Sequence, residues 1–225
     1  MKRYLRNLGT LSSQEQEELK NKKVLIIGMG GLGGDIIDGL ARFGIGYLRI
    51  IDFDRFELSN LNRQLLASED TIGKLKIDVA KIYIEKINSK IVIDEISLKV
   101  TEENINKFFK DMDLVIDCTD NIETKILIEK YSQKYNINLI YGAVGGWYGN
   151  VAIIYPKSPF LKDIYSNFTY GIEKKLGTPR FTVSMVASIQ LNLAIKSLLN
   201  KQLPDKGFFY IDMRNLELEW IKIGS

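Results

Sequence analysis

The feature that most constrains the fold is a glycine-rich turn between a buried strand and a helix. The run Gly28-Met29-Gly30-Gly31-Leu32-Gly33 follows the apolar residues 24–27 and precedes a segment, 35–43, whose apolar side chains have helical spacing. Such a turn lets the backbone approach a phosphate closely, and the helix N-terminus supplies unpaired N–H groups and a partial positive charge. Asp52 ends the next predicted strand, 47–51, where a carboxylate can bind a ribose. A tight turn that needs small residues only for packing is the alternative.

Strand and helix patterns alternate along the first two thirds of the chain. Buried or alternating apolar runs predict strands, and spaced apolar residues predict helices. We expect strands at 24–27, 47–51, 91–98, 114–116 and 137–141, and helices at 35–43, 74–87, 101–109 and 122–135. This alternation is typical of a doubly wound, mostly parallel, Rossmann-like α/β sheet.

The pattern changes after residue 141. A strand at 150–155, a long apolar helix at 181–199 and a hairpin of 208–213 with 216–223 predict an antiparallel C-terminal extension. Residues 156–180 lack periodicity and are expected to form a long, mobile, crossover-type loop. Residues 1–22 form an N-terminal arm and a short helix, with Ser13 and Gln16 as a capping box. We expect residues 1–225 to form a single domain.

Composition excludes several kinds of chemistry. The chain has no histidine and one cysteine, Cys118, so it can hold neither a histidine-based catalytic unit nor an internal disulfide nor a four-cysteine zinc site. The net charge of +3 is too small to indicate nucleic acid. No apolar run approaches the roughly 20 residues of a spanning helix, and the basic N-terminus is not followed by a signal-like stretch. We expect a cytoplasmic protein.

Three polar segments indicate which nucleotide chemistry the turn serves. Residues 59–64 (Ser-Asn-Leu-Asn-Arg-Gln), Lys76 and residues 117–121 (Asp-Cys-Thr-Asp-Asn) are all expected at the carboxyl edge of the parallel strands. Hydride transfer needs no cations beside the phosphates. Cleavage of a phosphoanhydride does, because negative charge builds on the departing pyrophosphate. Asp120 is the candidate to hold a magnesium ion that bridges phosphate oxygens.

These motifs, in this order, resemble those of the ThiF/MoeB/HesA family, bacterial relatives of the ubiquitin-activating enzymes. The resemblance runs from the N-terminus to about Tyr155, is weaker over 178–199, and includes Arg3-Tyr4-Leu5-Arg6. It implies an adenylyltransferase: the Gly-Gly carboxylate of a small β-grasp sulfur carrier protein attacks the α-phosphate of ATP, releasing pyrophosphate. It also implies a homodimer, with no membrane and no nucleic-acid partner.

The resemblance assigns roles residue by residue. Arg63 and Lys76 would contact the triphosphate, Asp120 would hold Mg²⁺, and Arg6 would reach the γ-phosphate bound by the neighbouring subunit. The residues implied in nucleotide binding are Gly28, Gly30, Gly31, Gly33, Asp52, Ser59, Asn60, Asn62, Gln64 and Asn121. Simpler explanations remain open: Arg63 and Lys76 as solvated surface charges, Asp120 as a helix cap, Arg6 as part of a loose tail.

The chain also departs from the family pattern. Many relatives bind a structural zinc through two Cys-x-x-Cys pairs, which this chain lacks, so no zinc is expected. Residues 156–179 must then be held by other contacts, for which Phe160, Tyr165, Phe168 and Tyr170 are candidates, or be loose when no partner is bound. Cys118 is expected to be buried and inert, so that the chemistry ends at the acyl-adenylate. Residues 142–149, with Trp147 and Tyr148, form either a narrow channel for a Gly-Gly tail or a glycine-rich turn.

Other functions stay open at this point. The same fold could activate another carboxylate, on a peptide or on a modified tRNA. An NAD-dependent oxidoreductase explains the glycine turn but not the cations. A non-enzymatic nucleotide-binding protein would not need Arg63, Lys76 and Asp120 together. The pathway of the carrier is not specified by the sequence.

Overall fold

The computed structural model describes residues 2–165 and 173–224. Their strands form one mixed sheet in the order β3-β2-β1-β4-β5-β6-β7-β8. The first five in chain order are parallel: β1 (Lys23–Ile27), β2 (Tyr47–Ile51), β3 (Val92–Ile96), β4 (Leu114–Asp117) and β5 (Leu139–Gly145). The last three extend the sheet antiparallel: β6 (Tyr148–Ile154), β7 (Gly207–Asp212) and β8 (Glu217–Lys222). The predicted fold class, including the antiparallel extension, is confirmed.

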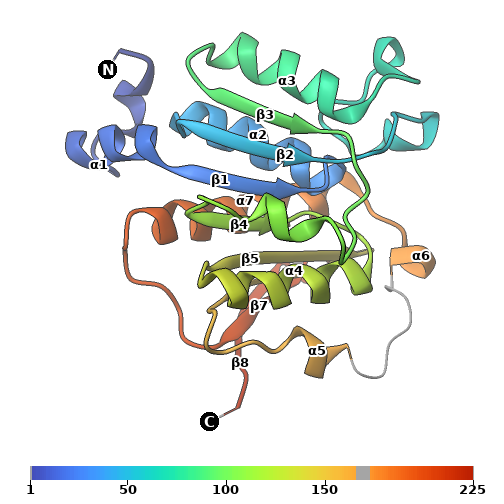
Figure 1. Ribbon diagram of the computed structural model, residues 1–225. Helices are drawn as coiled ribbons and strands as arrows, with labels where there is room; N and C mark the ends of the chain where they lie inside the picture. Colours follow the sequence, from blue (N-terminus) through green and yellow to red (C-terminus); the bar gives the residue numbers. More distant parts are fainter. Residues whose placement is uncertain (1, 166–172, 225) are drawn as a thin grey trace.

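Helices cover both faces of this sheet (Figure 1). The apolar core on one face joins α2 (Gly31–Phe43), α3 (Lys76–Ile87) and α7 (Arg180–Leu198), and the core on the other face joins α4 (Ile122–Tyr135) and the 3₁₀ turn η5 (Ile105–Phe108). The smaller elements are α1 (Ser13–Glu18), α5 (Leu161–Ile164), α6 (Glu173–Leu176) and the 3₁₀ turns η1 (Lys2–Asn7), η2 (Leu19–Asn21), η3 (Leu58–Asn60) and η4 (Glu69–Thr71). This layering places the carboxyl ends of β1, β2 and β4 at one edge, between the two helical layers.

Some predicted boundaries are wrong. Helix α2 begins at Gly31 rather than at residue 35, because the glycines of the turn themselves take up the first helical turn. The segment 101–109 forms only the short 3₁₀ turn η5 instead of a helix. The capping box of α1 is Ser12 with Glu15, not Ser13 with Gln16, since Ser12 accepts from the Glu15 N–H.

The glycine-rich region 142–149 is mostly strand. Residues up to Gly145 continue β5, Tyr148 begins β6, and Gly145 pairs with Tyr148 across the hairpin. Gly146 has a positive φ of 58° in the turn between them. The prediction of a strand beginning at 150 therefore placed the hairpin's second strand two residues late. A Cβ on Gly142 would lie 2.5 Å from Gln190, and one on Gly149 would lie 2.3 Å from Val186, so these two glycines let α7 pack closely on the sheet.

The segment 156–180 contains secondary structure where a loop was expected. It holds α5 and α6, and residues 166–172, which include the expected contacts Phe168 and Tyr170, lie outside the described residues. Phe160 and Leu161 are buried, and the Tyr165 hydroxyl hydrogen-bonds that of Tyr141. Phe160 and Tyr165 therefore make the predicted contacts for the described residues 160–165.

The N-terminal arm packs far from the carboxyl edge. In η1, Tyr4 is buried and its hydroxyl accepts from Asn88 Nδ2 at 3.0 Å, while Arg3 donates to Asn88 Oδ1. The N-terminus and α1 lie at the left of Figure 1, where the strands begin, whereas the arrowheads of β1–β3 point to the right. Arg6 is exposed on this arm.

Helix α7 is long and apolar enough, by length and composition alone, to cross a membrane, so the expectation that no apolar stretch approaches that length is wrong. In the structure its core-facing side packs against the sheet and α2, and half of its apolar stretch is buried. The helix is thus a core element of the fold.

Candidate functional site

A cleft of about 1330 Å³ opens at the carboxyl edge of the parallel strands. It runs from the glycine turn, past the polar segments after β2 and β4, to the aromatic face of β5–β7. The predicted site residues that line it are Gly28, Gly30, Gly31, Asp52, Ser59, Asn60, Arg63, Gln64, Lys76, Asp120 and Asn121. Gly33, Asn62 and Arg6 are not among the residues that line it.

The glycines of the turn serve two different purposes. Gly28 has a φ of 96°, and a Cβ there would lie 2.6 Å from the Cys118 carbonyl oxygen. A Cβ on Gly33 would lie 2.0 Å from the Gly28 oxygen, so both residues are required for packing within the turn. At Gly30 the nearest atom to a Cβ is Gln64 Nε2, 3.7 Å away, so this glycine is open toward the cleft. The N-terminus of α2 therefore offers its N–H groups to an anion, as its 13 residues and aligned dipoles favour.

Asp52 is fixed by the glycine turn and by its own loop. Its Oδ2 accepts from the Met29 N–H at 2.6 Å and its Oδ1 from the Asp54 N–H at 2.7 Å. Burial raises the pKa of Asp52, and these two backbone bonds oppose that rise. Each carboxylate oxygen keeps a lone pair for a further donor, such as a ribose hydroxyl.

Lys76 is a buried cation rather than a solvated surface charge. The side chain begins α3, is 7% exposed, and its Nζ lies 3.1 Å from Asp54 Oδ2. Because it lines the cleft, its charge acts where water is partly excluded and electrostatic interactions are stronger. Asp54 holds it in place through this ion pair.

The segment after η3 is held by its own side chains. The amide of Asn60 closes η3 by accepting from the Glu57 N–H at 3.0 Å, and Arg63 Nη1 donates to the Ser59 carbonyl and to Asn62 Oδ1, both at 2.9 Å. Asn62, which does not line the cleft, also donates to the carbonyl of Thr178, which does, at 3.4 Å. Gln64 is buried, and its Oε1 has no hydrogen-bond partner among the described residues. An unpartnered polar atom in the cleft wall marks a place where a ligand can bind.

Asp120 and Asn121 are adjacent, but only one of them caps α4. Asn121 is the N-cap of α4: its Oδ1 accepts from the Thr124 N–H at 2.9 Å and from the Thr124 hydroxyl at 3.1 Å. The alternative explanation of Asp120 as a helix cap is therefore wrong. Asp120 is exposed in the cleft, and within the described part of the chain its carboxylate has no hydrogen bond or ion pair. It is available to a ligand or metal ion.

Cys118 lies behind these residues and is buried. Burial, followed by the nearby Asp117, raises the pKa of its thiol well above the ordinary value. A protonated buried thiol is a poor nucleophile, which agrees with the expected inert role.

The structure adds residues near the site that the sequence patterns did not predict. Arg180 at the start of α7 binds Asp35 with two hydrogen bonds, of 2.7 and 2.8 Å, and donates to the Arg63 carbonyl at 3.0 Å. It thus fixes the segment of Arg63 against α2. No local signal reveals this contact, because its members are over one hundred residues apart in the sequence.

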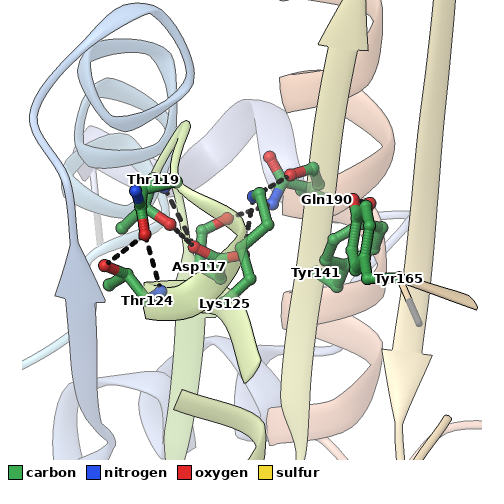
Figure 2. A network of polar contacts seen from close by, with 9 residues as sticks. Asp117, Thr119, Thr124, Lys125, Tyr141, Tyr165 and Gln190 are labelled. Carbon is green, nitrogen blue, oxygen red and sulfur yellow. Dashed lines mark hydrogen bonds and ion pairs between the residues drawn. The ribbon is translucent and has the colours of Figure 1, made fainter. Parts of the chain in front are cut away.

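A second missed group is a buried polar network behind the cleft (Figure 2). Lys125 on α4 forms an ion pair of 2.8 Å with Asp117 at the end of β4, and the two side chains are 4% and 0% exposed. The available signal was a lysine on the apolar stripe of the helix, between Ile122 and Ile128.

The far end of the cleft is aromatic. Tyr148 and Tyr210 stack with their ring centroids 6.1 Å apart, and both line the cleft together with the small residues Ala143 and Gly145. Trp147 does not line it; it lies at the surface against Phe181, with centroids 4.8 Å apart. Asn150 on β6 also lines this end, and its buried Oδ1 has no partner among the described residues.

Fold and site together define a Rossmann-like α/β protein whose glycine turn, cations and free carboxylate suit a phosphate-bearing nucleotide. The model of the ThiF family matches residues 3–224. The chain therefore belongs to the ThiF family, as its motifs predicted.

The names of similar proteins indicate which enzyme class within the family this chain resembles. A molybdopterin-synthase adenylyltransferase of Haemophilus influenzae is 35% identical over 193 residues, covering 84% of this chain and 79% of that protein. A sulfur carrier protein adenylyltransferase of Thermus thermophilus is 31% identical over 66% of this chain, which spans about half of that protein (55%). The crystal structure of E. coli MccB with ATP superposes with a TM-score of 0.84 at 26% identity, over 100% of this chain and 72% of that one. The predictions of the family and of an adenylyltransferase are confirmed.

Proposed function

We propose that this protein activates the C-terminal carboxylate of a small β-grasp carrier protein ending in Gly-Gly, by adenylation with ATP. The observation that carries the proposal is the meeting, in one cleft, of the N-terminus of α2, the cations Arg63 and Lys76, and the unpaired carboxylate of Asp120. The names of the molybdopterin-synthase and sulfur carrier adenylyltransferases support it.

The reaction needs charge stabilisation more than proton transfer. A carboxylate oxygen of the carrier attacks the α-phosphorus of ATP, and the bond from this phosphorus to the bridging oxygen of the β-phosphate breaks. Pyrophosphate leaves with the electron pair, and the acyl-adenylate remains. Lys76, held by Asp54, and Arg63, held by the Ser59 carbonyl, present fixed positive charge to the phosphates. Fixed charges need no rearrangement during the reaction, which is why they lower the barrier.

The residues present fit a magnesium ion bound jointly with a substrate. Mg²⁺ sites in nucleotide enzymes commonly use one or two carboxylates, with phosphates and water completing the shell. Asp120 supplies one unpaired carboxylate in the cleft, and no cluster of three or more potential ligands from His, Cys, Asp and Glu occurs in the described ranges. When bound there, the ion would neutralise charge on the phosphates, and Asp120 would fix its position.

The aromatic half of the cleft is the proposed entry for the carrier tail. Ala143, Gly145 and Gly149 leave room along the sheet, and the stacked Tyr148 and Tyr210 form a wall. A Cβ on Gly149 would lie 2.3 Å from Val186, so this glycine is also required by packing on the opposite face. A slim tail without side chains fits such a passage better than a branched one.

We also propose a homodimer, with Arg6 acting on the nucleotide of the partner subunit, and a cytoplasmic location. The support for the dimer is the distance along the fold between the exposed Arg6 on η1 and the carboxyl edge (Figure 1). The small net charge of +3 disfavours a nucleic-acid partner.

The test is carrier-dependent exchange of labelled pyrophosphate into ATP, against a panel of carriers that end in Gly-Gly. Asp120→Ala and Arg63→Ala should each reduce exchange by at least about a hundredfold, the effect of removing one fixed group that stabilises the transition state. Lys74→Ala, an exposed lysine outside the cleft lining, is the matched control and should leave exchange unchanged. Exchange at the normal rate in both cleft variants would refute the mechanism.

A second candidate is adenylation of a different carboxylate, favoured by the likeness to the E. coli MccB structure solved with N-formylated MccA (TM-score 0.84, 26% identity). Exchange that is stimulated by a peptide or a modified tRNA, and by none of the carriers, would support it. Stabilisation against heat by NAD but not by Mg-ATP would instead point to an oxidoreductase.

A further inference from the structure

Lys125 is a buried charge that the proposed reaction does not use directly. Its Nζ donates to Asp117 Oδ2 and to the Gly142 carbonyl, both at 2.8 Å, and lies 5.0 Å from the centre of the Tyr141 ring. The ammonium thus joins three elements: β4, which ends at Asp117, α4, which carries it, and β5 (Figure 2).

Asp117 uses its two carboxylate oxygens for different purposes. Oδ2 accepts from Lys125, whereas Oδ1 accepts from the Thr119 N–H at 2.9 Å and from the Thr119 hydroxyl at 2.7 Å. The bonds to Thr119 curl the chain immediately before Asp120. Gln190 on α7 holds the same residue from behind, donating to the Asp117 carbonyl at 2.9 Å. The direction in which Asp120 leaves β4 is therefore set by the Asp117 side chain.

The Gly142 carbonyl lies on β5 between Tyr141 and Ala143, which line the other half of the cleft. Gly142 lies on β5 opposite Val151 of β6, in the hairpin whose far end forms the aromatic passage. A Cβ on Gly142 would lie 2.5 Å from the Gln190 amide, so strand and helix are in close contact there. One ammonium group therefore connects the loop of Asp120 with the strand along which the carrier tail is proposed to enter.

We propose that Lys125 is a positioning residue for adenylation: by binding Asp117 and the Gly142 carbonyl together, it sets Asp120 relative to the incoming carboxylate. This inference rests on the proposed function. Stability alone does not require the pair, because a buried ion pair costs desolvation energy that often cancels its attraction, and apolar replacements can be equally stable. Alignment of two reacting groups, in contrast, is lost when the charges are removed.

The test compares Lys125→Met with Lys130→Met. Lys130 is the matched control on the same helix: it is 63% exposed and pairs with Glu102 at the surface. Lys125→Met should lower kcat for pyrophosphate exchange by about 10- to 100-fold, the usual loss when the partner of a site residue is removed. The KM for ATP should change much less, since Arg63 and Lys76 are untouched. Lys125→Arg should restore part of kcat.

A second readout does not depend on activity. Amide hydrogen exchange at residues 118–121 should accelerate in Lys125→Met, because the Asp117–Thr119 curl loosens, and should stay normal in Lys130→Met. If Lys125→Met fails to fold, the double variant Asp117→Asn with Lys125→Met replaces it, since it buries no unpaired charge.

The outcomes distinguish failure of the positioning role of Lys125 from failure of the proposed function. A folded Lys125→Met or double variant with normal kcat and normal loop exchange overturns the positioning role. A double variant with lowered kcat and faster amide exchange at residues 118–121 supports the positioning role. The double variant buries no unpaired charge, so an unpaired charge is then excluded as the cause. Absence of exchange in the unsubstituted protein with every carrier overturns the proposed function, and this inference with it.

Discussion

Asp120 and Asn121 show how adjacent residues acquire separate roles. The side-chain oxygen of Asn121 accepts a hydrogen bond from the first turn of α4. The neighbouring Asp120 carboxylate is not needed for this cap and has no partner among the described residues. Removing the cap would cost about 1 kcal/mol of helix stability, whereas removing Asp120 should cost little stability and most of the activity. The two effects can be measured separately.

Cys118 supports a prediction about pH. At pH 8.5 about half of an ordinary thiol is ionised and reacts readily with iodoacetamide. Burial and the charge of Asp117 raise the pKa of Cys118, so its thiolate is suppressed at that pH and alkylation of the folded protein should be far slower than that of the unfolded chain. Mass spectrometry after timed alkylation measures this. In addition, Cys118→Ala should retain pyrophosphate exchange; a total loss with an intact fold would give the thiol a catalytic role.

At the scale of elements, α5 is attached to α4 by one buried carboxylate. Glu129 is 2% exposed, and its Oε1 accepts from both the Phe160 and the Leu161 N–H groups at 2.8 Å. These donors stand at the start of α5, where helix N–H groups lack partners in the helix itself. In a chain with a single cysteine, this contact and the buried Phe160 hold the start of α5.

Glu129→Ala should therefore weaken this attachment. Two buried N–H groups would lose their acceptor, which costs about 1–3 kcal/mol of unfolding free energy. Urea denaturation measures the loss, and limited proteolysis should show earlier cleavage between residues 156 and 176. Glu85→Ala, at an exposed position on α3, should change stability by less than about 0.5 kcal/mol. Equal stability of the two variants would mean that α5 is held by apolar packing alone.

At the scale of the whole molecule, the sheet separates the N-terminal arm from the cleft. Tyr4, buried beside Asn88, holds η1 near the ends of α2 and α3, where the strands begin (Figure 1). The proposed action of Arg6 on a nucleotide at the carboxyl edge therefore requires a second copy of the chain. Two-fold symmetric dimers make such an exchange reciprocal, so each subunit would complete the site of the other.

Mixing subunits tests this arrangement. Arg6→Ala and Lys76→Ala should each be nearly inactive alone. Mixed after dissociation, they should recover about a quarter of the normal activity, because half of the dimers are mixed and each mixed dimer contains one intact site. Sedimentation would verify that dimers form. No recovery in verified mixed dimers would confine Arg6 to its own subunit or to no role.

Local patterns were sufficient for the architecture. The strands at 24–27, 47–51 and 114–117 and the helix at 122–135 were predicted within a residue, because buried apolar runs and helical spacing are properties of the sequence itself. The residues that cap the helices were harder to predict. The cap of α1 was assigned to Ser13 instead of Ser12, and the cap considered for α4 was Asp120 instead of Asn121, since several adjacent side chains could accept the same N–H group. The start of α2 was placed late because glycine is a weak helix former in isolation.

The amino-acid sequence by itself determined the fold class of the sheet, the glycine turn and the set of polar residues at the carboxyl edge. Each of these depends on neighbouring residues and on the regular spacing of apolar side chains. Only the tertiary structure decided which of those residues are free to act. Lys76 and Lys125 both became buried and paired, Arg180 joined the segment of Arg63, and the Asp120 carboxylate stayed exposed in the cleft with no partner among the described residues. Burial and pairing depend on contacts between residues far apart in the chain, which no local pattern encodes.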